Sequence, residues 1–267
     1  MPSSERLERA ARSWDEALAA WAVPEAILRA APESPWGFPP ELFSLSARSA
    51  LDDPEATPSR MRALEALGEG GTVLDVGAGG GAASLPLAPR AAHVVAVDES
   101  EEMLHTLGEL ASIRSVPHRL VQGRWPDVGP WVGRADVVVC HHVVYNVPDL
   151  VPFLRALGAK AERRVVMELT ASHPQSDLNA LWRKLHAVER PSRPVAEDLL
   201  DVLDAMGIAV RSERFRQPSL WASADRQQRV AFARRRLCVG PDRDAEIDLL
   251  LSDADRELVT VWWDREA

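Results

Sequence analysis

Cysteine is scarce in this chain of 267 residues, which has only Cys140 and Cys238, far apart in the sequence. Two distant cysteines argue against a secreted disulfide scaffold, because such domains carry several closely spaced pairs. They also argue against a structural zinc site, which usually needs four ligands at close spacing. A chain of this length can bury a full hydrophobic core, so it needs no covalent cross-links to fold.

Long apolar runs are missing, and basic residues are outnumbered by acidic ones. No stretch approaches the roughly 18 consecutive apolar residues of a transmembrane helix, and the N-terminus has no apolar signal core. We therefore expect a cytoplasmic protein without a membrane span. The formal net charge of −9 disfavours nucleic acid as a partner, because proteins that bind a phosphate backbone usually present a basic surface.

From residue 72 onward, short apolar segments alternate with segments of helical periodicity. This alternation indicates βαβ units and a parallel sheet. The glycine-rich turn after the first strand is expected to lead into a helix that runs to Leu87. The expected strands are residues 72–76, 93–98, 118–122, 135–140, 163–169, 208–215 and 257–264. The other expected helices are residues 100–110, 148–158, two between 176 and 206, 224–238 and 242–251.

The first 57 residues have a different character. Leu7, Ala11, Trp14, Leu18 and Trp21 recur at helical spacing, which predicts an amphipathic helix with both tryptophans in the core. The segment PESPWGFPP at 32–40 contains four prolines, which exclude regular structure there. Short helices are expected up to residue 30 and near residues 41–51 and 58–67.

The most specific motif is Asp75-Val-Gly77-Ala-Gly79-Gly-Gly81, directly after the first strand. Glycines let the backbone turn sharply and approach a ligand closely, and a helix N-terminus after them would point at that ligand. Asp98 follows Gly77 by 21 residues, at the end of the second strand. A carboxylate there can accept hydrogen bonds from both hydroxyls of a ribose. The motif therefore predicts a nucleoside-cofactor site.

Two cofactor classes use such a site. The spacing Gly77-x-Gly79-x-x-Ala82 also fits the dinucleotide fingerprint. However, Asp75 would lie near the anionic pyrophosphate of NAD, whereas S-adenosylmethionine has no phosphate and carries an ammonium and a sulfonium. Asp75 therefore favours S-adenosylmethionine. An NAD(P)-dependent oxidoreductase is one alternative, and a catalytically silent protein that keeps the cofactor fold is another.

Over about residues 58–170 the chain resembles the class I S-adenosylmethionine-dependent methyltransferases. VLDVGAGGG resembles the first motif of that family and VVAVDESEEML the second, while VQGRWPDV and ADVVVCHHVVYNVPDL stand where the third and fourth motifs lie. The resemblance implies a doubly wound α/β fold with a mostly parallel sheet of seven strands, the last antiparallel. Residues 58–267 would form the cofactor-binding domain, with a helical insertion at 216–252 before the last strand.

The resemblance also implies roles for individual residues. Asp75 and the 77–81 loop would hold the methionine end of the cofactor, Asp98 the ribose, and residues 123–125 the adenine. Many members have an acidic residue after the third strand, where this chain has Arg124 and Trp125, so Trp125 could stack on the adenine or Asp127 could substitute. The cofactor-binding candidates are Asp75, Gly77, Ala78, Gly79, Gly81, Asp98, Glu99, Gly123, Arg124, Trp125, Cys140 and His141.

Cys140-His141-His142 ends the fourth strand, at the edge where open α/β sheets bind ligands. An imidazole can remove a proton near neutral pH, so His141 and His142 are candidates for a general base, and Glu168 at the end of the fifth strand is a third. Alternatively, these residues only shape the pocket. No further ligand at metal-binding spacing accompanies the histidines, so we expect no metal. The candidates for substrate binding are Trp36, Phe38, His142, Tyr145, Glu168 and His173.

These observations predict a methyltransferase that acts on a small-molecule acceptor. The helices of residues 1–57 and the insertion 216–252 would form a lid over the substrate. The sulfonium already activates the methyl group, so catalysis needs mainly in-line placement of the two reactants. The attacking atom can be oxygen, nitrogen, carbon or sulfur. The charge run at 234–236 is interpreted as a solvated helix face.

Overall fold

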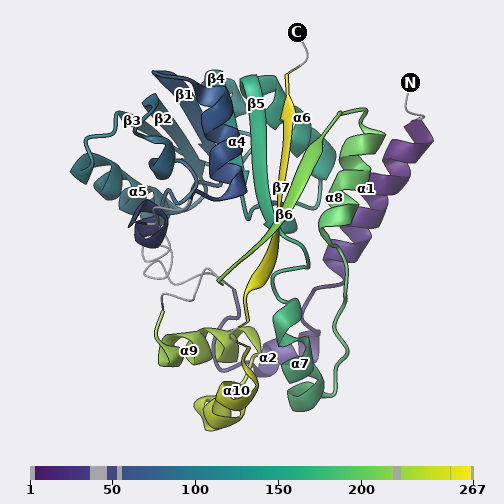
Figure 1. The fold of residues 1–267 in the computed structure, drawn as a ribbon. Coiled ribbons are helices and arrows are strands. Elements are labelled where there is room, and N and C mark those ends of the chain that lie inside the picture. The colour runs from purple at the N-terminus through teal and green to yellow at the C-terminus, as the bar shows by residue number, and fades with distance from the viewer. Residues whose placement is uncertain (1–3, 37–46, 53–55, 219–223, 253, 266–267) are drawn as a thin grey trace.

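The computed structural model describes residues 4–36, 47–52, 56–218, 224–252 and 254–265. Seven strands form one sheet in the order β3-β2-β1-β4-β5-β7-β6 (Figure 1). Strands β1 to β5 run parallel, and β7 is antiparallel to both β5 and β6, which confirms the predicted sheet with its antiparallel last strand. The strands are β1 (Gly71–Val76), β2 (Ala91–Asp98), β3 (His118–Gln122), β4 (Ala135–His141), β5 (Ala161–Thr170), β6 (Arg211–Gln217) and β7 (Arg256–Asp264).

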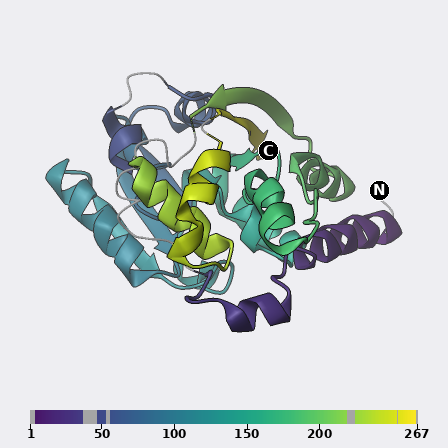
Figure 2. The same ribbon diagram turned by 90° about the horizontal axis from the view of Figure 1, so that it is seen from below.

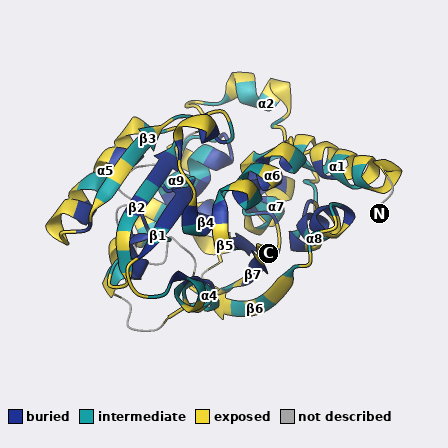
Figure 3. Ribbon diagram, turned by 90° about the horizontal axis from the view of Figure 1, so that it is seen from above, coloured by how far each residue is buried: buried dark blue, intermediate teal, exposed yellow. Residues whose placement is uncertain are grey.

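Helices cover both faces of this sheet. On one face lie α4 (Pro58–Leu67) and α5 (Glu101–Ile113), and on the other lie α1 (Ser4–Ala19), α6 (Leu150–Lys160) and α8 (Ala196–Ala205). Strand β4 sends Val137 and Val139 into the first layer and Val138 and Cys140 into the second. A strand that is covered on both faces needs apolar residues at every position, which explains its continuous apolar run. Figure 3 shows these buried strands between more exposed helices.

The expected helix after the glycine-rich turn is wrong. The chain makes turns from Gly79 onward and reaches only a short 3₁₀-helix at Leu85–Leu87. Glycine disfavours helix by about 1 kcal/mol per residue, and Pro86 lacks the N–H that an α-helix there would need. The glycine loop is therefore shaped by its own backbone and by β2 rather than by a helix N-terminus.

Helix α1 belongs to the sheet layers and not to a lid. It packs against α8 and α6, and Trp14 on its inner face is buried in the same cluster as Phe153. The indole N–H of Trp14 donates a hydrogen bond to the carbonyl of Val147 at 2.8 Å. The expected lid segment 1–57 is thus divided, because its first helix completes the core. Of the helix expected near 41–51, residues 47–52 lie in the described part and are helical.

A third apolar cluster lies away from the sheet, and we call its four helices the cap. They are α2 (Glu25–Ala30), α7 (Asn179–His186), α9 (Arg226–Arg236) and α10 (Asp244–Leu250). Figure 1 shows them beyond the carboxyl ends of the parallel strands, and Figure 2 shows α9 and α10 lying across those ends. The insertion contributes α9 and α10 as predicted. The cap also includes α7, which the sequence did not assign to it.

Helix α9 is held by local and distant contacts. The N-terminal capping residue of α9 is Asp225, whose side chain accepts a hydrogen bond from the backbone N–H of Gln228 at 2.7 Å. The Gln228 side chain in turn accepts a hydrogen bond from the backbone N–H of Asp225. The expected solvated face at 234–236 is wrong for Arg236, which is buried. Arg236 Nη1 donates to the carbonyl of Pro35 at 2.7 Å, which ties α9 to the chain after α2.

Candidate functional site

The glycine loop follows β1 at the carboxyl edge of the sheet. Gly77, Gly79 and Gly81 all have positive φ angles, of 71°, 50° and 91°. The N–H groups of Gly77 and Ala78 donate to the carbonyl of Val97 at 2.9 and 3.0 Å, which ties the loop to β2. A Cβ atom on Gly77 would lie 2.3 Å from Cγ2 of Val143, in the loop after β4. Glycine at 77 therefore lets two ligand-edge loops approach each other.

Alanine at Gly77 should destabilise the protein more than alanine at Gly70. Both glycines have nearly the same φ, 71° and 72°, so the backbone strain of about 1–2 kcal/mol is matched. Gly70 has open space around its Cα, whereas Gly77 faces Val143, and this overpacking should add about 1–3 kcal/mol. Urea denaturation of both variants measures the difference. Equal losses would show that Val143 yields without cost.

Asp98 links the loop to the next helix. Its Oδ2 accepts a hydrogen bond from the Gly79 N–H at 2.8 Å, and its Oδ1 accepts one from the Ser100 N–H at 2.9 Å. Each oxygen of a carboxylate can accept a further hydrogen bond. The two hydrogen bonds hold the Asp98 carboxylate in a defined orientation. Because Asp98 is only partly buried, its remaining lone pairs are still available to a ligand.

Asp75 is the most unusual group at this edge. It is 1% exposed, and no cationic side chain of the described residues acts on its carboxylate. Burial raises the pKa of Asp75 to about 7, with a smaller contribution from the charge of Asp98, although hydrogen bonding by Ser84 favours the ionised form. Buried carboxylates are normally balanced by a positive charge or by several hydrogen bonds, so one beside a ligand loop with only Ser84 to stabilise it points to a cationic ligand.

The segment expected at the adenine is divided between surface and core. Arg124 and Glu99 are exposed, with Nε and Oε1 3.7 Å apart. Trp125 is buried in the cluster under α6, and its indole N–H donates to the carbonyl of Phe153 at 3.4 Å. Stacking of Trp125 on an adenine would require an exposed ring face. Gly123 donates its N–H to the carbonyl of Asp98 at 2.9 Å, which keeps this segment beside the ribose candidate.

A row of polar residues crosses the edge of the sheet under α4. His141, Glu168 and Thr260 stand side by side on β4, β5 and β7. Ser59, in the first turn of α4, donates a hydrogen bond through Oγ to Glu168 Oε2 at 2.6 Å, and the same Oγ lies 2.6 Å from Thr260 Oγ1. Sequence reasoning missed Ser59 and Thr260. Side chains alternate between the two faces of β7, so the sequence could have predicted that Thr260 lies on the same face as Trp262. No local sequence pattern indicates Ser59.

His142 adopts a left-handed conformation with φ of 60° directly after β4. Its N–H donates to the carbonyl of Glu168 at 2.7 Å, and its Nε2 lies 3.1 Å from Glu168 Oε1. Burial opposes ionisation of Glu168, yet the two neighbouring histidines and the hydrogen bond from Ser59 lower its pKa to about 2. Burial lowers the pKa of His141 to about 4, and its Nε2 has no partner in the described part of the chain. At neutral pH the site therefore holds an ionised Glu168 beside a neutral His141.

Tyr145 and His173, two of the substrate candidates, are packed into an aromatic cluster. The Tyr145 hydroxyl donates to the carbonyl of Thr170 at 2.8 Å, and its ring stacks on Trp14 with centroids 5.8 Å apart. The His173 ring stacks on Trp21 at 3.8 Å with an interplanar angle of 14°. All four rings are buried, so the cluster joins the end of α1 to the loop after β5.

The remaining candidates lie in different surroundings. Cys140 is buried among the residues under α6, on the opposite face from His141, and burial raises the pKa of its thiol. Trp36 is 50% exposed. Phe38 lies outside the described residues.

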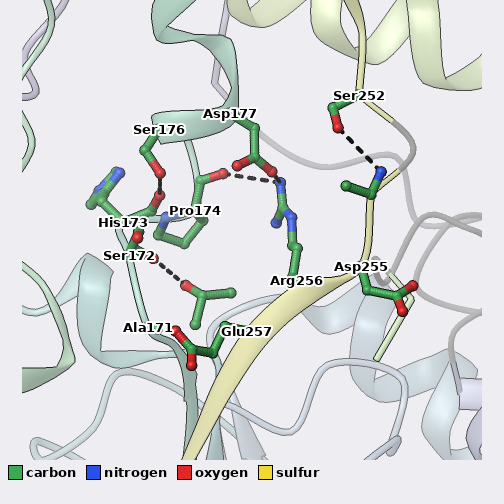
Figure 4. Close-up of a pocket in the computed structure, with 12 residues that line it drawn as sticks. Ala171, Ser172, His173, Pro174, Ser176, Asp177, Ser252, Asp255, Arg256 and Glu257 are labelled. Atoms are coloured by element: carbon green, nitrogen blue, oxygen red, sulfur yellow. Dashed lines mark hydrogen bonds and ion pairs between the residues drawn. The ribbon is translucent and has the colours of Figure 1, made fainter. Parts of the chain in front are cut away.

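A small pocket opens where the loop after β5 meets the start of β7 (Figure 4). Arg256 reaches across it, with Nη2 2.5 Å from Asp177 Oδ2 and 3.2 Å from the carbonyl of Pro174 (Figure 4). Most of its lining residues have polar side chains, and it lies beside the aromatic cluster through His173. The guanidinium is already neutralised by Asp177, so the pocket offers no unpaired charge from this residue.

Within the described ranges, no group of three or more histidine, cysteine or acidic side chains is arranged to hold a metal ion. Nor does any helix in that part of the chain have the length and apolar character to cross a membrane.

Residues 73–159, which contain the glycine loop, Asp98 and both candidate histidines, match the family described as the methyltransferase domain. This segment is therefore a methyltransferase domain. A ubiquinone biosynthesis O-methyltransferase of Bordetella parapertussis is 34% identical to it over 121 residues, which are 42% of this chain and 48% of the relative. The chain thus matches about half the length of this curated relative.

Two solved structures show the same fold as this methyltransferase domain. The YcgJ protein of Bacillus subtilis has 16% identity and a TM-score of 0.55, covering 78% of this chain and 98% of its own. A cyclopropane-fatty-acyl-phospholipid synthase-like protein of Lactobacillus casei has 14% identity and a TM-score of 0.55, covering 94% of this chain and 98% of its own.

Proposed function

We propose that this domain binds S-adenosylmethionine and transfers its methyl group to a small molecule in the cytoplasm. The observation that carries the proposal is Asp75, whose buried carboxylate has no cationic partner among the described residues and lies next to the glycine loop. A cationic ligand would relieve the cost of this buried charge, whereas the pyrophosphate of a nicotinamide dinucleotide would increase it. S-adenosylmethionine carries both an ammonium and a sulfonium.

The other residues at the edge fit an adenosyl group. Asp98 is held by Gly79 and Ser100 and has lone pairs left for ribose hydroxyls. The positive φ angles of the loop glycines keep side chains away from the place where a ligand would meet the backbone. When bound, S-adenosylmethionine supplies a methyl group that is activated by the sulfonium charge, so the protein needs mainly to align an acceptor with it.

Two features support a small-molecule acceptor. The cap of α2, α7, α9 and α10 lies beyond the carboxyl ends of the strands and would limit access for a large partner (Figure 2). The formal net charge of −9 disfavours a nucleic acid. The Bordetella parapertussis relative, by its name, also acts in the biosynthesis of a small molecule.

Alanine at Asp98 should weaken binding of S-adenosylhomocysteine by about 10- to 150-fold, the loss expected for charged hydrogen bonds worth about 1.5–3 kcal/mol. Isothermal titration calorimetry measures this change. Alanine at Glu102, an exposed acid on α5, is the control and should leave affinity unchanged. Unchanged affinity in the Asp98 variant would remove this residue from the site. Binding of NAD in place of S-adenosylhomocysteine would overturn the proposal in favour of an oxidoreductase.

Transfer itself is tested with methyl-labelled S-adenosylmethionine and fractionated small-molecule extracts, with labelled products detected by mass spectrometry. A labelled product that depends on the protein supports methyl transfer. Tight cofactor binding without any labelled product would favour the catalytically silent alternative.

A further inference from the structure

Glu168 is the centre of a buried hydrogen-bond relay that leads to the ligand edge. Ser59 donates its single hydroxyl proton to Glu168 Oε2, so the 2.6 Å contact between Ser59 and Thr260 must be a hydrogen bond donated by Thr260. Ser59, Glu168 and Thr260 are all buried, which keeps water from competing for these bonds. The second oxygen of Glu168, Oε1, faces His142 Nε2 at 3.1 Å.

The relay determines which nitrogen of His142 carries the proton. An ionised carboxylate only accepts hydrogen bonds, and Glu168 is ionised at neutral pH. The nitrogen that faces it, Nε2, must therefore be protonated. In a neutral imidazole this leaves Nδ1 without a proton, as a hydrogen-bond acceptor. The side chain of His142 is 21% exposed against 6% for Glu168, so part of the imidazole remains accessible to a ligand.

His141 is the less suitable base. Burial lowers its pKa to about 4, and its Nε2 is enclosed. The backbone of His142, by contrast, is fixed by its N–H bond to the carbonyl of Glu168 and by its left-handed conformation. His142 thus has a tautomer fixed by a hydrogen bond, whereas the Nε2 of His141 is enclosed without a partner among the described residues.

We propose that Nδ1 of His142 removes the proton of a hydroxyl group on the acceptor, that Glu168 fixes the tautomer, and that Ser59 is a positioning residue. This inference rests on the proposed methyl transfer and narrows the acceptor to a small alcohol or phenol. Thiolates and neutral amines attack without prior loss of a proton, whereas a hydroxyl oxygen is a weak nucleophile until a base removes its proton.

The step balances without a further reactant. The acceptor O–H bond breaks and its proton binds Nδ1, while the oxygen forms a bond to the methyl carbon. The bond from that carbon to sulfur breaks, and its electron pair stays on sulfur. The resulting imidazolium of His142 is stabilised by the negative charge of Glu168 and returns its extra proton to water.

The tautomer is measured without any acceptor. Long-range ¹H–¹⁵N correlation spectra of the full-length ¹⁵N-labelled protein at pH 7 should show a protonated Nε2 and an unprotonated Nδ1 for His142. The signals are assigned by their loss in His142→Gln. Glu168→Gln and Ser59→Ala should each lose the single fixed tautomer, and Ser59→Thr, which keeps a hydroxyl, should restore it.

Thr72→Ala is the matched control. Thr72 donates through Oγ1 to Asp136 Oδ2 at 2.9 Å at the opposite edge of the sheet, so this variant loses a similar bond without touching the relay. Its His142 signals should stay unchanged. A wild-type protein with the proton on Nδ1, or a fixed tautomer that survives in both Glu168→Gln and Ser59→Ala, would overturn the proposal.

The base role is measured on the acceptor found by methyl labelling. His142→Gln should lower kcat about 10²- to 10⁴-fold and leave KM and S-adenosylhomocysteine affinity unchanged. Ser59→Ala should lower kcat less, with recovery in Ser59→Thr. Near-normal kcat in His142→Gln, or a product methylated on nitrogen or carbon, would overturn this inference while the proposed function stands. Failure to bind S-adenosylhomocysteine would instead overturn the proposed function, and the tautomer result would be unaffected.

Discussion

Asparagine at Asp75 should stabilise the ligand-free protein above pH 7 and weaken S-adenosylmethionine binding about 100-fold. The carboxylate is buried and has no cationic partner in the described structure, and its pKa is raised to about 7 from an ordinary value of 3.8. At about 1.4 kcal/mol per pKa unit, the charged form opposes folding by about 4 kcal/mol. An asparagine amide removes the charge, but its own unsatisfied polar atoms reduce the resulting gain in the free energy of unfolding by about 1–3 kcal/mol.

The sign of this effect depends on pH. The folded state holds the Asp75 proton more tightly than the unfolded state, so stability falls as pH rises from about 4 to about 7 and stays low above that. Asp75→Asn should therefore exceed the wild type in free energy of unfolding at pH 8 and lose this advantage near pH 4. Urea denaturation at both pH values measures this difference in stability. Calorimetry at pH 8 measures the weaker binding of S-adenosylmethionine, which loses a negatively charged partner in the variant.

Asp136→Asn is the matched control for Asp75→Asn. Burial opposes ionisation of Asp136, but hydrogen bonds from Thr72 and the charge of Arg163 lower its pKa below the ordinary value. Its ionised form therefore stabilises the fold above the ordinary pKa, and Asp136→Asn should be less stable than the wild type at pH 8 with unchanged ligand affinity. Destabilisation of Asp75→Asn at pH 8, or unaltered binding by it, would contradict a ligand-directed carboxylate.

Alanine at Trp182 should destabilise the cap by about 3–5 kcal/mol, the usual loss for a buried tryptophan. Trp182 is 1% exposed and packs with residues of α9 and α10. The Arg190 guanidinium lies 4.7 Å from the centre of the Trp182 ring and 5.5 Å from the centre of the Trp21 ring. Arg190 therefore connects the cap to the aromatic cluster. Because three separate chain segments share this core, all of them should loosen together.

Hydrogen exchange tests whether the cap opens as a unit. Exchange in α7, α9 and α10 should rise in Trp182→Ala, whereas β1 and β4 should keep their protection. Trp131→Ala is the control, because Trp131 is 67% exposed and outside the cap. An equal rise of exchange in the central strands would show that the cap and the sheet unfold as one body.

Much of the sheet could be predicted from the sequence. Strands covered on both faces need apolar residues throughout, so runs such as 135–140 are visible without a structure. The glycine loop and Asp98 were also predictable, because a tight turn and an acid at the end of the next strand are local features. A helix at 224–238 was predicted from its periodicity, and the structure shows that the Asp225 side chain caps its start.

The candidate site was predicted only in part. His142 and Glu168 were found because they lie near the ends of two adjacent strands, but Ser59, the partner of Glu168, lies 109 residues earlier and is placed by the packing of α4. Tyr145 and His173 are polar residues near strand ends, a pattern typical of binding sites. The structure instead buries both in a cluster with Trp14 and Trp21.

The sequence by itself determined which residues reach the carboxyl edge of the sheet, because strand periodicity and the order of βαβ units are local properties. Only the tertiary structure decided which of those residues have partners. Asp75 is left without a cationic partner, Glu168 receives hydrogen bonds from Ser59 and His142, and α7 joins the cap from the middle of the chain. A hydrogen bond requires two groups within about 3 Å, and for distant residues that separation is set by helix packing and strand register rather than by sequence spacing.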